Sequence, residues 1–343
     1  MYEFALNLHH RLAAEGDLVW SPYSVASALG LTAAGARGRT YDELVQVLGA
    51  APDELGLAEA AAIEDAEIAV ANALWLREGM PIEEAYERTA RRFPGASLHN
   101  ADFAGDAEGA RQAVNAEVAK VTRELIRDLL PAGSVDARTA AVIVNALYLK
   151  VAWQHAFATG DTAQVPFHGP SGRRRVPTMR RTGRMPYAEA GGWRMVTLAA
   201  GGGVVADVLL GDGGAPSPAT LRELYGAARP AKVGLSVPRF RVESEASLAD
   251  PLRELGVTTA FGGDADFSGM TPARVCVDRI QHKAVLDVDE QGFEGAAATA
   301  VMMVLASMDM SSPVEFRVDR PFLVVVRHPA TEAVYFLARV TEP

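Results

Sequence analysis

A glycine-rich stretch is the first place where this sequence could do chemistry. Residues 201–206 read GGGVVA and mimic the glycine pattern that cradles the phosphates of a dinucleotide. The residues that follow favour a strand, so no helix N-terminus is available to a phosphate. The sequence also lacks a Gly-x-Ser-x-Gly elbow, a P-loop and a histidine pair at metal-binding spacing. We therefore expect a hairpin turn here, and a protein that is not an enzyme and holds no cofactor or metal.

The single cysteine, Cys276, excludes an internal disulfide and any metal site built from several cysteines. Because it lies in ARVCVDRI, which favours a strand, we expect it to be a small buried hydrophobic residue.

Arginines are concentrated in one short tract, at residues 173–175, Arg180, Arg181 and Arg184. A solvated strand face explains the tract, and a site for a polyanion or for a protease surface is the alternative. The formal net charge of the chain is -10, which disfavours nucleic-acid or anionic-membrane binding by the molecule as a whole.

The N-terminus reads as an amphipathic helix without the basic start of a secretory signal, and no run approaches the length of a membrane span. We expect a cytoplasmic protein, or a secreted form whose leader has been removed.

Helical patterns dominate the first third of the chain, and strand patterns dominate from about residue 165 onward. Helices are predicted over residues 2–14, 21–36, 40–49, 81–93, 106–130 and 247–256. Ser21 and Thr40 are predicted N-caps, Gly49 is a predicted helix end, and Pro131 should stop the long helix. Residues 66–79 and 139–153 are predicted strands, the second buried on both faces. The last segments of the chain are predicted hairpin strands joined at HPATEA, residues 328–333. Helices first and strands later, without a βαβ rhythm, indicate an α+β fold with mostly antiparallel or mixed sheets.

The most unusual segment is DEQGFEGAAATAV, residues 289–301. It follows an alternating strand that places Ala284, Leu286 and Val288 on one face. Small residues without a large apolar side chain between Phe293 and Val301 are too small for a core and more apolar than those of an ordinary linker. From the residues alone, a plain Ala-rich helix or linker remains an explanation, although Gly292 and Gly295 each lower the helix propensity by about 1 kcal/mol.

Four stretches together resemble the serpin family: residues 21–31, 144–153, 282–301 and 320–343. Their order and spacing cover nearly the whole chain. The resemblance implies a single domain over residues 1–343 with three β-sheets, about eight or nine helices and an exposed reactive-centre loop at about residues 290–312. In most serpins that loop is bait for a serine or cysteine protease, and insertion of the cleaved loop into the central sheet traps the acyl-enzyme.

The resemblance makes the start of the loop a hinge. We use "hinge" for Glu290, Gly292, Phe293, Glu294, Gly295, Ala296, Ala297, Ala298 and Thr299. Gly292 permits a backbone turn, and Glu294 would stay on the solvent face while alternate residues face inward. Roughly 17 extended residues, from Glu290 to Ala306, span about 55 Å. A domain of this length has a diameter of about 50 Å, so full insertion would carry a bound protease from one pole to the other.

The resemblance places the scissile bond between Ala306 and Ser307, with Leu305, Met303 and Met308 as alternatives. No Arg or Lys lies between Val301 and Met310, which argues against a trypsin-like target. The neighbourhood suits elastase-, subtilisin- or chymotrypsin-like enzymes, whose pockets are apolar. The expected partner is a target serine protease in a covalent acyl complex with a monomeric inhibitor.

A polar cluster beneath the central strands is also implied, and we call it the shutter: Ser21, Ser24, Asn145 and His282. Hydroxyls, an amide and an imidazole can exchange hydrogen-bond partners as strands separate. From the residues alone, Ser21 is equally explained as a helix cap and His282 as a satisfied core group.

Trp153 and Lys283 match family positions near the point where insertion begins, which we call the breach. Ordinary packing and a surface charge are the alternative explanation.

Phe293 departs from the family pattern, because inhibitory serpins usually carry a small Thr or Ser at this first inward-facing hinge position. A phenylalanine needs a pocket and could slow insertion, since overpacking costs about 1–3 kcal/mol. The alternative function is therefore a non-inhibitory serpin, a carrier or chaperone-like binding protein that the protease cleaves as a substrate.

Overall fold

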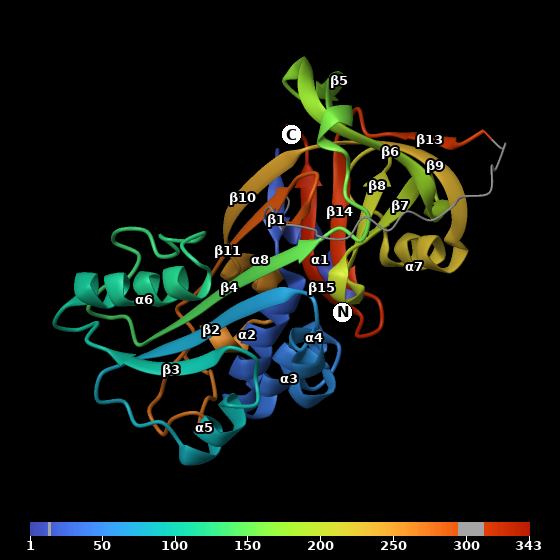
Figure 1. Cartoon of the computed structure of the whole chain (residues 1–343). Helices are drawn as coiled ribbons and strands as arrows, with labels where there is room; N and C mark the ends of the chain where they lie inside the picture. The colour runs from blue at the N-terminus through green and yellow to red at the C-terminus, as the bar shows by residue number, and fades with distance from the viewer. Residues whose placement is uncertain (13–14, 294–311) are drawn as a thin grey trace.

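The structure is a computed structural model, and it describes residues 1–12, 15–293 and 312–343. Over these residues the chain forms eight α-helices and two hydrogen-bonded β-sheets (Figure 1). The predicted α+β class is confirmed. The expectation of three sheets is corrected to two, because β6 (Gly172–Ala190) runs on without a break. Its residues 178–187 pair with β9, and its last four residues pair with β7.

The larger sheet has nine strands and forms the upper part of the molecule in Figure 1. Eight of them follow the order β1 (Leu18–Trp20), β15 (Ala333–Val340), β14 (Phe322–His328), β8 (Val205–Leu210), β7 (Trp193–Ala199), β6, β9 (Arg229–Pro238) and β13 (Val314–Arg317), while β5 (Ala163–Gly169) pairs with β6 off this path. The predicted hairpins β7–β8 and β14–β15 are both present and antiparallel. The glycine triplet 201–203 turns the chain between β7 and β8, so no dinucleotide site forms there.

The smaller sheet carries the segment of most interest. Its strands are β10 (Phe240–Ser247), β11 (Arg279–Val288), β12 (Gly292–Phe293), β4 (Ala141–Ala152), β2 (Glu67–Arg77) and β3 (Ala96–Ala101), in that order. Strand β4 is buried on both faces, as its run of apolar and β-branched residues predicts. Ile143, Leu147 and Leu149 face the cores on one side, and Val142 and Val144 face the core beneath α6 on the other.

Most helices lie around the lower part of the molecule in Figure 1, whereas the helix of residues 218–227 packs against β6 and β7 of the larger sheet. The helices are α1 (Tyr2–Arg11), α2 (Pro22–Gly35), α3 (Gly38–Leu48), α4 (Leu57–Ala61), α5 (Glu84–Ala90), α6 (Ala107–Val121), α7 (Pro218–Ala227) and α8 (Ala249–Glu254). Ser21 caps α2 as predicted, with its Oγ accepting from the Ser24 N–H at 3.1 Å. Gly49 ends α3 in the left-handed conformation.

Three local predictions about the helices are corrected. Thr40 lies inside α3, and its Oγ1 accepts from the Asp266 N–H instead of capping the helix. Helix α5 is shorter than residues 81–93. Helix α6 ends at Val121, well before Pro131, because Arg123 and Glu124 have φ values of 51° and 65°. These left-handed conformations stop the helix where the amphipathic pattern would have continued it.

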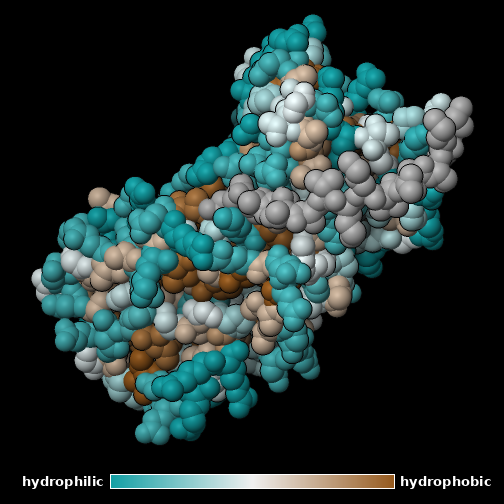
Figure 2. All heavy atoms as spheres, in the orientation of Figure 1, coloured by the Kyte–Doolittle hydropathy of each residue, from teal (hydrophilic) through white to brown (hydrophobic). Residues whose placement is uncertain are grey.

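Cys276 is also corrected: it lies in an extended segment just before β11, outside any strand, and it is half-buried. Hydrophilic residues cover most of the face seen in Figure 2, and hydrophobic residues show mainly in the lower part of the molecule, in hollows over the smaller sheet and at the lower left. The apolar side chains otherwise lie between the two sheets and beneath the helices.

Candidate functional site between β4 and β11

Strands β4 and β11 are neighbours that pair over only part of their length. They form a parallel ladder from Arg279–Val142 to His282–Asn145. Farther along, Lys283–Asp287 and Ala146–Lys150 form no ladder with each other in the described residues. At the far end β12 lies between the two strands, with Phe293 opposite both Val288 and Val151. The two strands therefore diverge. Where they pair directly they are one strand spacing apart, about 4.8 Å, and at the far end they are two spacings apart because β12 lies between them.

The four shutter residues meet at the closed end of this wedge. The Ser21 N–H donates to His282 Nε2 at 3.0 Å, and the Ser24 hydroxyl donates to Asn145 Oδ1 at 2.6 Å. His282 Nδ1 lies 3.1 Å from the same Asn145 oxygen. All four residues are buried. The cluster thus ties helix α2 to the last paired rung of β4 and β11.

These contacts define the tautomer and the protonation state of the His282 imidazole. Nε2 accepts a hydrogen bond, so Nδ1 carries the proton and donates it to Asn145 Oδ1. Burial lowers the pKa of His282 to about 4, against a weaker opposing effect of Asn145. The ring is therefore neutral at physiological pH.

Two members of this cluster were not predicted from the sequence. Asn72 on β2 lies directly opposite Asn145, and its Oδ1 accepts from the Asn145 amide. The Asn72 amide in turn donates to Ser27 Oγ on α2 at 2.7 Å. The signal that could have revealed Asn72 is an amide within an otherwise apolar strand, at VANAL in residues 70–74.

The first part of the hinge forms a tight turn at the open end of the wedge. Asp289 Oδ1 accepts from the N–H groups of Gln291 and Gly292, which turns the chain back between the strands. Gly292 has a φ of 156° and pairs with Ala152. A Cβ at Gly292 would collide with the Val151 carbonyl oxygen, so this close approach requires glycine.

Phe293 fills a pocket at the same point. Its side chain is 1% exposed, and its ring centroid lies 4.6 Å from that of Trp153. Trp153 is itself buried, and its indole N–H donates to the Asp289 carbonyl at 2.9 Å. The pocket that Phe293 needs is thus present beside Trp153, and the Phe293 ring already fills it.

Glu290 is held by residues that the sequence analysis missed. Its carboxylate accepts from the Thr162 hydroxyl at 2.6 Å and lies 3.6 Å from the Arg239 guanidinium, although its side chain is buried. The Phe157 N–H donates to its carbonyl. Nothing local in the sequence links Arg239 to Glu290, since the two are joined only across the fold.

The grouping of Lys283 with Trp153 is corrected. Lys283 follows His282 directly on β11 and forms an ion pair with Glu243 on β10 at 2.8 Å. Trp153 contacts Asp289, six residues farther on, which corresponds to roughly 20 Å along an extended strand. The cation at the breach is Arg239 instead.

The remaining predicted positions lie outside the described residues. They are the hinge residues Glu294, Gly295, Ala296, Ala297, Ala298 and Thr299 and the reactive-bond residues Met303, Leu305, Ala306, Ser307 and Met308.

Among the described residues, no helix is long and apolar enough to cross a membrane. The His, Cys, Asp and Glu side chains of these residues form no group of three or more that could hold a metal ion.

Comparison with known proteins gives a consistent result. The family model described as "Serpin (serine protease inhibitor)" matches residues 1–343. Serpin-Z2B of Oryza sativa subsp. japonica is 33% identical, over 99% of this chain and 96% of its own. The solved structure of uncleaved ovalbumin matches with a TM-score of 0.89 and 26% identity, over 100% of this chain and 98% of that one. Serpin48 of the insect Tenebrio molitor, described as a highly specific serpin, matches with a TM-score of 0.86 and 26% identity, over 100% and 96%.

Proposed function

Because the chain belongs to the serpin family of serine protease inhibitors, we propose that it traps a serine protease by inserting its cleaved loop between β4 and β11. Members of this family are inhibitors of proteases and not enzymes. The proposed target has an apolar pocket, as elastase-, subtilisin- and chymotrypsin-like enzymes do. We further propose that the chain acts as one domain and as a monomer.

One observation carries this proposal. Gly292 and Phe293, at the start of the loop, already pair with β4, and Phe293 also pairs with β11. Beyond them the two strands are unpaired with each other over five residues, down to the rung of Asn145 and His282. The next loop residues can therefore continue β12 in the same direction, and each one adds backbone hydrogen bonds worth about 0.5–1.5 kcal/mol net.

The chemistry belongs to the target protease. Its serine Oγ attacks the carbonyl carbon of Ala306, the bond to the Ser307 nitrogen breaks, and an acyl-enzyme forms with the new amine as leaving group. Insertion of the freed segment then carries the enzyme across the molecule and distorts it before water can complete hydrolysis. In this scheme no side chain of the inhibitor takes part in the bond-breaking step.

Phe293 favours this reading over the substrate alternative. A large residue slows insertion when it must create its own space, but the pocket beside Trp153 already contains the Phe293 ring. The overpacking cost therefore does not arise during the reaction, and the smaller residues that follow enter next.

A pair of matched variants tests the proposal. Strand alternation places Ala297 on the same face as Phe293, which points inward, and Glu294 on the opposite face. We expect Ala297→Arg to abolish the detergent-resistant complex with an elastase-like protease, because it would bury an unpaired guanidinium. Glu294→Arg is the control: an inserted residue 294 would lie beside Lys150 and the partly exposed Asp287, so its guanidinium stays in water and the complex should still form.

The readout is a denaturing gel, with mass spectrometry of the released fragment to identify the bond cut. Cleavage of the parent protein by every enzyme in an elastase, subtilisin and chymotrypsin panel, with no complex from any of them, would sink the inhibitor proposal. That outcome would favour the non-inhibitory carrier or chaperone-like alternative.

A further inference from the structure

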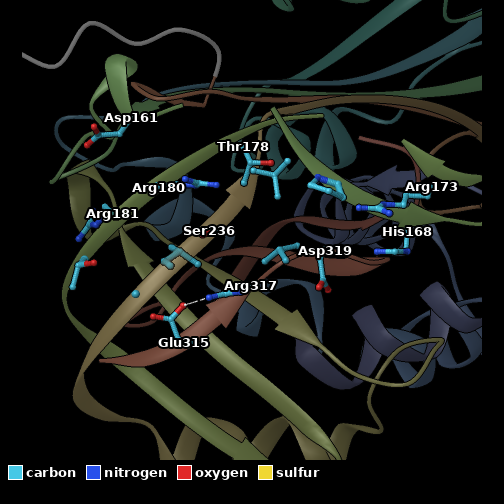
Figure 3. Close-up of a pocket in the computed structure, with 16 residues that line it drawn as sticks. Asp161, His168, Arg173, Thr178, Arg180, Arg181, Ser236, Glu315, Arg317 and Asp319 are labelled. Atoms are coloured by element: carbon cyan, nitrogen blue, oxygen red, sulfur yellow. Dashed lines mark hydrogen bonds and ion pairs between the residues drawn. The ribbon is translucent and has the colours of Figure 1, made fainter. Parts of the chain in front are cut away.

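The arginine tract of β6 lines a groove that plays no part in the proposed insertion. The groove has a volume of about 680 Å³ and lies over β5, β6, β9 and β13 (Figure 3). That volume is within the usual range of small-molecule sites, about 300–1,000 Å³. We propose that it binds an anion that carries several phosphate or sulfate groups.

A row of three residues across neighbouring strands forms the floor of the groove. Arg180 on β6 is directly opposite Ser236 on β9, and Ser236 is directly opposite Arg317 on β13. Residues that oppose each other across strands share one face of the sheet. Two guanidiniums thus stand on either side of one hydroxyl, about 10 Å apart at their backbones, and Figure 3 draws all three around the same hollow. Long arginine side chains from both sides can reach one oxyanion and bind it through paired N–H donors.

The charges of the lining are not balanced. Four arginines and three carboxylates line the groove, but Glu315 is paired with Arg317, and Asp319 is paired with Arg320. This leaves Arg173, Arg180 and Arg181 against Asp161. Within the described residues, the guanidinium groups of Arg173 and Arg180 have no hydrogen-bond or ion-pair partner, and both residues pair only through the backbone of their strands. Strand β6 carries six arginines in all, within a chain whose net charge is -10.

Glu315 acts as an internal competitor for the ligand. Both Nε and one terminal nitrogen of Arg317 lie 3.2 Å from its Oε2. The carboxylate also lies across Gly234, where a Cβ would be only 3.1 Å from Oε1. It therefore occupies one of the two guanidiniums that an oxyanion would use, and a ligand must displace it from Arg317. This gives the site a residue whose neutralisation should strengthen binding.

Water and salt screen the charge of an exposed arginine, so one phosphate on one of them would bind weakly. Several anionic groups on one molecule can use Arg180 and Arg317 together with Arg173 at the other end of the groove. This favours a multiply charged ligand. Polyphosphorylated small molecules and sulfated oligosaccharides share this chemistry, and the test separates the two.

The experiment measures binding to the intact protein by calorimetry at about 0.15 M salt. The probes are myo-inositol hexakisphosphate and a heparin-derived tetrasaccharide. The double variant Arg180→Ala, Arg317→Ala should weaken binding by about tenfold or more, because each guanidinium supplies charge-assisted hydrogen bonds. Glu315→Gln should tighten binding severalfold. The double variant Arg91→Ala, Arg92→Ala removes the same number of charges just after α5, at the opposite end of the molecule in Figure 1, and should leave the affinity unchanged.

The two probes identify the ligand class: binding of only one of them assigns the groove to phosphate esters or to sulfated sugars. The proposal is overturned if neither probe binds, or if the double variant of Arg180 and Arg317 loses no more affinity than the double variant of Arg91 and Arg92. No protease enters the binding measurement, so a failure of the proposed inhibitory function would leave this result unaffected.

Discussion

At the scale of single residues, the shutter is a buried polar network in which the central amide is fully used. Asn145 Oδ1 accepts from Ser24 and His282, and its amide nitrogen donates to the Ser24 carbonyl and to Asn72. A buried amide that makes all of its bonds is stable only while every partner keeps its protonation state. His282 is the partner that can change, because its Nε2 must remain unprotonated to accept the Ser21 N–H.

The first prediction concerns pH. The pKa of His282 is about 4 in the folded protein and 6.5 in the unfolded chain, so between these values only the unfolded chain takes up the proton. The stability that neutral His282 provides is complete above pH 6.5 and decreases as the pH falls towards 4. We expect a loss of roughly 2 kcal/mol between pH 6.5 and 5.

The measurement is urea unfolding at both pH values. A His282→Asn variant should be less stable at pH 6.5 but should lose much less on acidification. Buried His9, whose pKa is lowered to about 3, contributes in the same direction and remains in both proteins, so it cancels in the comparison. An equal pH dependence in the parent and the variant would refute the assignment to His282.

The second prediction concerns Phe293. Phe293→Ala should destabilise the intact protein by about 3 kcal/mol, because it removes a fully buried ring from its contact with Trp153. Phe293→Leu should retain most of that stability, since it still fills much of the pocket. Urea unfolding gives the free energies, and a red shift of Trp153 emission in the alanine variant would report water entering the pocket. A Phe293→Ala protein as stable as its parent would mean that β12 is not anchored by this side chain.

At the scale of elements, helix α6 and the wedge beneath it are linked. The chain that leaves α6 includes Leu125 and Ile126, and these two residues line a small hollow together with Leu147, Val285 and Phe293. The turn at Arg123 and Glu124 therefore positions apolar residues over the gap between β4 and β11. The positive φ values of Arg123 and Glu124 are of the kind that glycine adopts without strain.

The third prediction follows from that turn. Glu124→Gly should stabilise the intact protein by about 1 kcal/mol, since a residue with a Cβ pays a comparable cost in the left-handed region. Ala116→Gly is the matched control. It introduces the same residue at an exposed position inside α6, where glycine should cost about 1 kcal/mol. Chemical denaturation measures both, and changes of the same sign in the two variants would rule out backbone strain at Glu124.

At the scale of the whole molecule, the proposed mechanism requires that the intact fold is not the most stable arrangement of the chain. The wedge between β4 and β11 is filled at one end by β12 and joined at the other end by four pairs of residues. Filling it with a full strand would add a ladder on each side. The intact state must then be long-lived because of a kinetic barrier, and not because it is the free-energy minimum.

The fourth prediction is that cleavage near Ala306 raises the melting temperature of the protein by roughly 10 °C or more. About ten inserted residues add backbone hydrogen bonds worth on the order of 10 kcal/mol before the cost of opening the sheet. Calorimetry of the intact and nicked proteins measures the difference. Nicked Ala297→Arg should show little of this rise, because its loop cannot enter the sheet. A nicked parent protein that melts no higher than the uncut one would contradict the insertion mechanism.

The sequence by itself determined the features that depend on neighbouring residues. The Ser21 cap with Pro22 behind it, the doubly buried run of β4, the hairpin of β14 and β15 and the glycine turn after β7 all follow from local periodicity and turn chemistry. The four motifs with their spacing also indicated the serpin family, and through it the residues of the shutter.

Only the tertiary structure decided which distant residues meet. Asn72 joins the shutter across two strands, Arg239 replaces Lys283 beside Glu290, and Phe293 finds its pocket against Trp153. The residue at which α6 ends could not be predicted from the local pattern either. The amphipathic period continues through Arg123, whereas the packing of Leu125 and Ile126 requires a turn there. Such contacts join residues dozens to more than a hundred positions apart, and their energies depend on burial and geometry that no single stretch of sequence contains.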